Sequence, residues 1–219
     1  EDITGIRNIL YLCKNTGLKR VFYSSSSEVY GEPVELPQHE QTTTLNSRVP
    51  YAVVKNVGES FCKSFHKEFD LEYTVFRFFN TYGPNQTTDF VISKFLEAAL
   101  KNKPITIYGD GSQTRTFCYV DDNVEACLKT LFEDQHINDV INIGGADVMT
   151  ILELAQTIIR VTGSSSEIQY LPPLEEGDMT RRQPDNSKMK KLLGRELLSL
   201  EEGIKKMMKS PEYLSQIGM

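Results

Sequence analysis

Tyr51 and Lys55 are the residues of this chain best suited to proton-transfer chemistry. Positions i and i+4 of a helix lie on the same face, so a lysine ammonium here can favour the phenolate form of the tyrosine. A phenolate present near neutral pH is a general base. Because such a pair also arises by chance, its meaning depends on the segments around it.

Two predicted strands end in polar residues that suit this chemistry. The apolar residues 18–23 run into four serines, Ser24 to Ser27, followed by Glu28, and residues 72–79 run into Asn80. Ligands of open parallel sheets bind beyond the carboxyl ends of the strands, so Ser26 and Asn80 are expected to face one crevice. Asn80 has an alternative role as a turn residue before Gly83 and Pro84.

Three segments carry a family resemblance in their order and spacing: residues 23–31 (YSSSSEVYG), 51–55 (YAVVK) and 77–84 (RFFNTYGP). Together they resemble the extended short-chain dehydrogenase/reductase family that modifies nucleotide sugars. The resemblance implies an α/β fold, with a Rossmann-type parallel sheet and a smaller substrate-binding C-terminal domain. Residues 1–84 are then the C-terminal part of the NAD-binding domain. Residues 85–219 form mainly the substrate-binding domain, with 116–145 returning to the Rossmann sheet.

The dinucleotide-binding turn that opens this family, a strand followed by G-x-x-G-x-x-G, does not occur in the sequence. The chain also begins at Glu1 inside a predicted amphipathic helix. We therefore expect a fragment whose sheet lacks its N-terminal strands.

The resemblance assigns roles to individual residues. Ser26, Tyr51 and Lys55 match the catalytic triad, in which tyrosinate removes the proton of the sugar 4-hydroxyl while C4 gives hydride to NAD, producing a 4-keto intermediate. The cofactor contacts expected for NAD are Ser24, Tyr51, Lys55 and Phe78. The substrate contacts expected for the nucleotide sugar are Asn80 at the diphosphate, Tyr108 beside a uracil or thymine base, Arg115 at a phosphate, and Arg182 at the diphosphate.

Ser27 and Glu28 bear on which reaction follows the shared first step. Dehydratases of the family carry an aspartate-glutamate pair here, and a serine cannot serve as their proton donor at neutral pH. Ser27 and Glu28 together with Arg182 resemble the UDP-glucuronate decarboxylases, in which the 4-ketone makes the substrate a β-keto acid. Residues 85–89 form a shorter segment than expected for those enzymes.

Other reactions stay open at this point. A UDP-sugar 4-epimerase is the main alternative, because it needs only the triad and room for the sugar to turn. GDP-mannose dehydratases carry a similar Ser-Glu pair, which keeps 4,6-dehydration open. A non-catalytic nucleotide-binding module is the alternative of another class, although it would have no need of an intact Ser26, Tyr51 and Lys55.

Composition narrows the partners and the compartment. The 219 residues are 39% hydrophobic and 25% charged with a net charge of −6, without a membrane-length apolar run or a long basic cluster. Membrane insertion and nucleic-acid binding are therefore not expected. The four cysteines lack C-x-x-C spacing, which favours buried free thiols, a cytoplasmic location and no metal site.

Hydrophobic periodicity predicts the elements that position these residues. Helices are expected up to residue 15 and over 51–69, 90–101, 123–132, 150–162, 187–193 and 200–208, with strands at 20–24, 72–79, 105–108, 139–145 and 168–171. The loop 31–50 is expected to lie over the site. Asp121 and Asp122 are expected to cap a helix, and Thr150 with Glu153 to form a capping box. The broad apolar stripe of 51–69 suits either a core helix or, as the resemblance implies, a homodimer interface.

Overall fold

The computed structural model describes residues 2–42, 49–173 and 182–219. Residues 43–48 of the predicted loop lie outside these residues, as does Arg181, the neighbour of Arg182 in the sequence. The helices are α1 (Asp2–Thr16), η1 (Ser27–Tyr30, a 3-10 turn), α2 (Pro50–Phe69), α3 (Val91–Leu100), α4 (Val120–Phe132), α5 (Ile151–Thr162), α6 (Ser187–Leu193), α7 (Leu200–Lys209) and α8 (Pro211–Gln216). The strands are β1 (Arg20–Ser26), β2 (Glu72–Phe78), β3 (Thr81–Tyr82), β4 (Ile105–Tyr108), β5 (Thr114–Arg115), β6 (Cys118–Tyr119), β7 (Asp139–Ile143), β8 (Met149–Thr150) and β9 (Ile168–Leu171).

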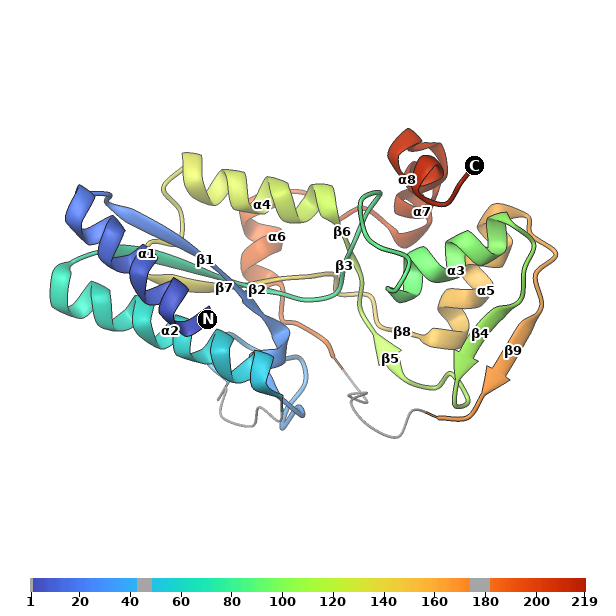
Figure 1. Cartoon of the computed structure of the whole chain (residues 1–219), viewed down its shortest axis with the longest axis horizontal. Helices are drawn as coiled ribbons and strands as arrows, with labels where there is room; N and C mark the ends of the chain where they lie inside the picture. Colours follow the sequence, from blue (N-terminus) through green and yellow to red (C-terminus); the bar gives the residue numbers. More distant parts are fainter. Residues whose placement is uncertain (1, 43–48, 174–181) are drawn as a thin grey trace.

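A parallel sheet with the order β1-β2-β7 forms one half of the molecule (Figure 1). Helix α2 is the crossover from β1 to β2, as expected for parallel neighbours. The register pairs Ser26 with Phe78 at the carboxyl ends of β1 and β2. Strand β7 pairs with β2, so the chain returns to this sheet after it has formed strands β4 and β5. The α/β, Rossmann-type parallel sheet expected from the sequence is thus confirmed.

Helices cover both faces of this sheet. Tyr73 and Val75 pack against α1 and α2, whereas Phe76 and Ile141 pack against α4 and α6. The alternation follows from the pleat, which points successive side chains to opposite faces. Burying a side chain such as Val75 stabilises the fold by about 1.5–3 kcal/mol.

A second body carries its own hydrophobic core, with α3 and α5 against the β4-β9 pair and α7 and α8 (Figure 1). Helix α5 begins at the expected capping box, in which Thr150 and Glu153 each bond the other's backbone N–H. A second box, Ser199 with Glu202, begins α7. Such caps stabilise a helix by about 1 kcal/mol.

Two short ladders form where the chain passes between the two bodies. β3 pairs with β6, and the Cys118 amide donates to the Asn80 carbonyl at 2.9 Å. β5 pairs with β8 in antiparallel fashion. These two-residue strands were not predicted, because two residues are too few to show a period of alternation.

The expectation that Asp121 and Asp122 cap a helix is wrong. Helix α4 begins at Val120 with Tyr119 as its N-cap, so both aspartates lie inside the first turn. Asp122 is buried, where it accepts from the Leu198 amide at 2.8 Å and pairs with Arg195 at 2.6 Å. Asp121 pairs with Lys206 at 2.8 Å. Carboxylates in the first turn still favour the helix through its dipole.

The apolar stripe of α2 is largely used within the chain. Phe61, Phe65 and Phe69 pack with α1 and the sheet, while Val53 is 49% exposed. All four cysteines are free thiols. In the described part of the chain, no helix is both long enough and apolar enough to cross a membrane.

Candidate active site

Strand β1 ends at Ser26 and continues directly into the 3-10 turn η1, so the four serines span this junction. Ser26 is the N-cap of η1, with its hydroxyl accepting from the Glu28 amide at 3.2 Å. Ser27 begins the turn and is buried. Ser25 points to the other face of the strand, where it donates to Glu59 at 2.6 Å. The alternation along β1 therefore turns the Ser25 side chain away from those of Ser24 and Ser26, although Ser25 is also among the residues that line the cavity described below.

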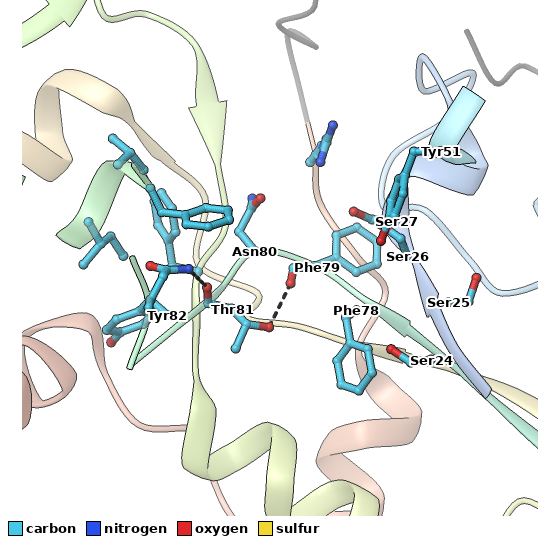
Figure 2. A pocket seen from close by; sticks show the side chains of 16 residues that line it. Ser24, Ser25, Ser26, Ser27, Tyr51, Phe78, Phe79, Asn80, Thr81 and Tyr82 are labelled. Atoms are coloured by element: carbon cyan, nitrogen blue, oxygen red, sulfur yellow. Dashed lines mark hydrogen bonds between the residues drawn. The ribbon is translucent and has the colours of Figure 1, made fainter. Parts of the chain in front are cut away.

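Tyr51 and Lys55 lie on one face of the first turns of α2, as their spacing predicts. Pro50 occupies the first turn, where a missing N–H costs nothing. The Lys55 ammonium donates to the Ser24 carbonyl at 2.8 Å and lies 5.5 Å from the centre of the Tyr51 ring. The Tyr51 ring extends from the start of α2 toward the serines, and 54% of the residue is exposed (Figure 2).

A cavity of about 350 Å³ lies beyond the carboxyl ends of β1 and β2. Ser24, Ser26, Ser27, Tyr51 and Phe78 line it, as Figure 2 shows. Sequence reasoning had assigned these residues to catalysis or to the cofactor, and the fold brings them to one cavity. Lys55 does not line it and reaches the site through Ser24 and the Tyr51 ring.

Arg182, which lies late in the sequence, lines the same cavity. Its guanidinium forms an ion pair with Glu28, and both side chains are mostly buried. The Nε–H of Arg182 is buried and lacks a protein partner among the described residues. A guanidinium has five N–H donors, so Arg182, which lines the cavity, has donors beyond the one that bonds Glu28 for a further acceptor.

A second cavity of about 250 Å³ continues from the first, and Tyr108 and Arg115 line it. The two cavities share Asn80, whose side-chain amide donates to the Thr116 carbonyl at 3.1 Å. Arg182 lies at the serine end of this cleft, and Arg115 at the other end. The roles of Asn80, Tyr108, Arg115 and Arg182 as substrate contacts stay predictions.

Several lining residues were not singled out from the sequence. Gln86 lines the first cavity, where its side-chain amide donates to the Thr81 carbonyl at 2.7 Å. It belongs to the segment 85–89, and the unusual shortness of this segment was the feature of the sequence that pointed to this region. Lys94 and Gln113 line the second cavity, and the Lys94 ammonium lies 5.5 Å from the centre of the Tyr108 ring. Their surface-like sequence context carried no such signal.

A twisted parallel sheet, polar strand ends and a Tyr-x-x-x-Lys helix define a nucleotide-dependent α/β class of protein. The NAD dependent epimerase/dehydratase family matches residues 1–144, and the chain belongs to that family. NAD is the cofactor of this family.

Individual relatives include decarboxylases and epimerases. UDP-glucuronic acid decarboxylase 2 of Arabidopsis thaliana is 36% identical over 215 residues, which cover 95% of this chain and 47% of the relative. The structure of a UDP-glucose 4-epimerase from Thermotoga maritima with UDP-glucose matches with a TM-score of 0.89 and 33% identity, covering 100% of this chain and 70% of that one. A UDP-glucuronic acid 4-epimerase from Bacillus cereus with UDP-glucuronic acid and NAD matches with a TM-score of 0.86 and 31% identity, covering 99% and 68%.

The chain spans about half the length of the curated relatives it matches. The residues present nevertheless fit one end of NAD. The Lys55 ammonium, anchored on the Ser24 carbonyl, offers further donors for ribose hydroxyls, and Phe78 offers an apolar wall to a flat ring.

Proposed function

We propose that this chain carries the reaction and substrate-binding centre of an NAD-dependent enzyme that acts on a UDP-sugar through a 4-keto intermediate. The reaction we propose is the decarboxylation of UDP-glucuronate. The observation that carries the choice of an acidic sugar is the ion pair between Glu28 and Arg182 beside the serine-lined cavity, and the likeness to UDP-glucuronic acid decarboxylases supports the choice of reaction. An arginine in that position provides a partner for a sugar carboxylate, which a neutral sugar would not need.

Each residue of the site has its own role in the proposed reaction. Tyr51 takes the proton of the sugar 4-hydroxyl, and Ser26 holds that oxygen by a hydrogen bond. Lys55 places its ammonium 5.5 Å from the centre of the Tyr51 ring and is proposed to bind the ribose of NAD. NAD, when bound, accepts a hydride from C4 and later returns it.

The 4-keto sugar of a uronic acid is a β-keto acid. Its C5–C6 bond breaks to release carbon dioxide, and the electron pair moves into the enolate at the C4 oxygen. A proton then returns to C5, so the net reaction is loss of carbon dioxide without net oxidation. Arg182 and Glu28 are proposed to hold the sugar end during this step, and Arg115 and Tyr108 the nucleotide end.

UDP-sugar 4-epimerisation is the second candidate. It is favoured by the likeness to solved 4-epimerases, one of which was solved with UDP-glucuronic acid itself. The short segment 85–89 also leaves the sugar end less like that of a decarboxylase. A carboxylate partner at Arg182 is compatible with decarboxylation and also with 4-epimerisation when the substrate is UDP-glucuronate.

The two reactions differ in the mass of the product. The protein, supplied with NAD, is incubated separately with UDP-glucuronate and UDP-glucose, and the products are analysed by mass spectrometry. We expect UDP-glucuronate to lose carbon dioxide. An unchanged mass with a new C4 epimer on chromatography would assign the protein to the epimerases, and binding without turnover would indicate a binding module.

We also propose a homodimer through α2 and the helix α1 that packs on it. Exposed apolar side chains on these helices support this assembly: Ile9, Leu12 and Val53. Sedimentation analysis should give twice the mass of the chain, and Leu12→Glu should reduce it to that of the monomer. A monomeric wild-type protein would refute the assembly.

A further inference from the structure

A row of buried polar side chains crosses the sheet directly beneath the candidate site. Ser25, Arg77 and Asn142 are register partners on β1, β2 and β7, and all are at most 2% exposed. Register partners point to the same face of a sheet, so the three form a continuous line. Neither the proposed chemistry nor the substrate contacts use this row.

Hydrogen bonds join the row to helix α2. Glu59, two helical turns after Tyr51, receives two parallel hydrogen bonds from Arg77, at 2.9 and 2.7 Å. Arg77 also donates to the Tyr30 hydroxyl at 2.9 Å, and that hydroxyl donates to the Asn142 side chain at 2.7 Å. These hydrogen bonds thus connect α2 with β2 and β7.

At its far end the row holds two loops together. The side-chain amide of Asn142 donates to the backbone carbonyl of Gln38 at 2.8 Å and to the backbone carbonyl of Asp185 at 3.2 Å. Backbone hydrogen bonds also join the two loops. The Gln38 N–H donates to the Gln183 carbonyl at 2.8 Å, and the Asp185 N–H donates to the Gln38 carbonyl at 2.9 Å. Arg182 immediately precedes the segment that is held in this way.

We propose that Asn142 is a positioning residue that fixes the segment 183–185 and thereby keeps Arg182 beside Glu28. Its side chain is completely buried and donates to one carbonyl of each loop. Without those two donors, both carbonyls lose a buried partner, and the segment that carries Arg182 loosens from the sheet. Tyr30 and Arg77 set the orientation of the Asn142 amide, because the Tyr30 hydroxyl occupies its oxygen and leaves the N–H groups for the loops.

The first test measures the loops themselves by hydrogen exchange. In Asn142→Ala, the backbone amides of residues 38–40, of Gln183 and of Asp185 should exchange about tenfold faster, as expected when about one buried hydrogen bond is lost. If the alanine variant does not fold, Asn142→Ser takes its place. Its small polar side chain cannot reach both carbonyls, so the same amides should again exchange faster.

Asn138→Ala is the matched control. Asn138 precedes the same strand β7 at its other end, where its side chain accepts from the Tyr73 amide at 3.1 Å. This variant should lower stability without selective exchange in the two loops. Equal exchange in the loops of the Asn142 and Asn138 variants, at matched stability, would overturn the proposal.

The second test measures binding and rests on the function proposed above. Asn142→Ala should lose about tenfold in affinity for UDP-glucuronate and keep its affinity for UDP, because Arg115 and Tyr108 remain in place. Equal losses for both ligands would indicate a general structural role and refute the positioning role. A wild-type protein that binds UDP-glucuronate no better than UDP would refute the proposed function of Arg182, while the exchange test would still decide the role of Asn142.

Discussion

Glu28 and Arg182 are 154 positions apart in the sequence, yet their side chains form an ion pair at the carboxyl end of strand β1. The pair joins the turn after the serines to the segment that follows β9. It holds the charged Arg182 side chain at a cavity whose other lining residues, Tyr51 among them, are uncharged. The proposed preference for an acidic sugar depends on this relationship.

Replacing Tyr51 by phenylalanine tests the general base. Tyr51→Phe should lower kcat by about 10²–10⁴-fold, the usual contribution of a positioned proton acceptor. The affinity for UDP should not change, because the second cavity is untouched. Turnover is measured by mass spectrometry and UDP binding by calorimetry. Tyr170→Phe, an exposed tyrosine on β9, is the control and should retain full activity.

Replacing Arg182 by methionine tests the carboxylate partner. Arg182→Met should weaken UDP-glucuronate binding by about 1.5–3 kcal/mol, the range for a hydrogen bond to a charged group, with little effect on UDP-glucose. Arg115→Met is the comparison and should weaken both ligands to the same extent. Competition calorimetry gives the affinities. A loss for both sugars in Arg182→Met would return this residue to the diphosphate.

The buried pair of Glu59 and Arg77 should matter strongly for stability. Their side chains are 4% and 3% exposed, and their atoms are 2.7 Å apart. Glu59→Gln leaves the Arg77 charge without its counter-ion and should lower the free energy of unfolding by about 3–5 kcal/mol. Urea unfolding measures it. In contrast, Glu201→Gln breaks the exposed pair with Arg160 and should change stability little. Similar losses in both variants would contradict this reasoning.

Asp139 should make stability depend on pH. Burial alone would raise the pKa of this carboxyl, but hydrogen bonds from His136, Lys188 and the Val140 amide outweigh burial and lower the pKa well below its usual value. A carboxyl whose folded pKa is depressed stabilises the protein above its unfolded pKa, near 4, and loses that contribution as pH falls toward the folded pKa.

The test compares urea unfolding at pH 7 and pH 3. The wild type should lose more stability on acidification than Asp139→Asn, which has no proton to take up. Asp70→Asn is the matched control, since the Asp70 side chain is 99% exposed, and it should behave as the wild type does. If Asp139→Asn shows the full pH dependence, Asp139 is not its source.

Local sequence patterns were sufficient for most of the elements and for one half of the site. The strand ends, the Tyr51-Lys55 spacing on α2 and the box of Thr150 with Glu153 depend on neighbours within a few residues, so they can be predicted from the sequence. The expected placement of Ser26 and Asn80 at one crevice follows from the parallel connection of β1 and β2, which is also a local rule.

Contacts between distant segments depend on tertiary structure. The pairing of Glu28 with Arg182, the buried row of Ser25, Arg77 and Asn142, and the use of Asp122 as a partner of Arg195 all join elements far apart in the chain. Burial decides them, because a polar group removed from water must find a partner wherever the fold offers one. The sequence by itself determined the family, the sheet and the candidate base. Only the tertiary structure decided that Arg182 lines the same cavity as the serines and that Asn142 bonds the segment that follows Arg182.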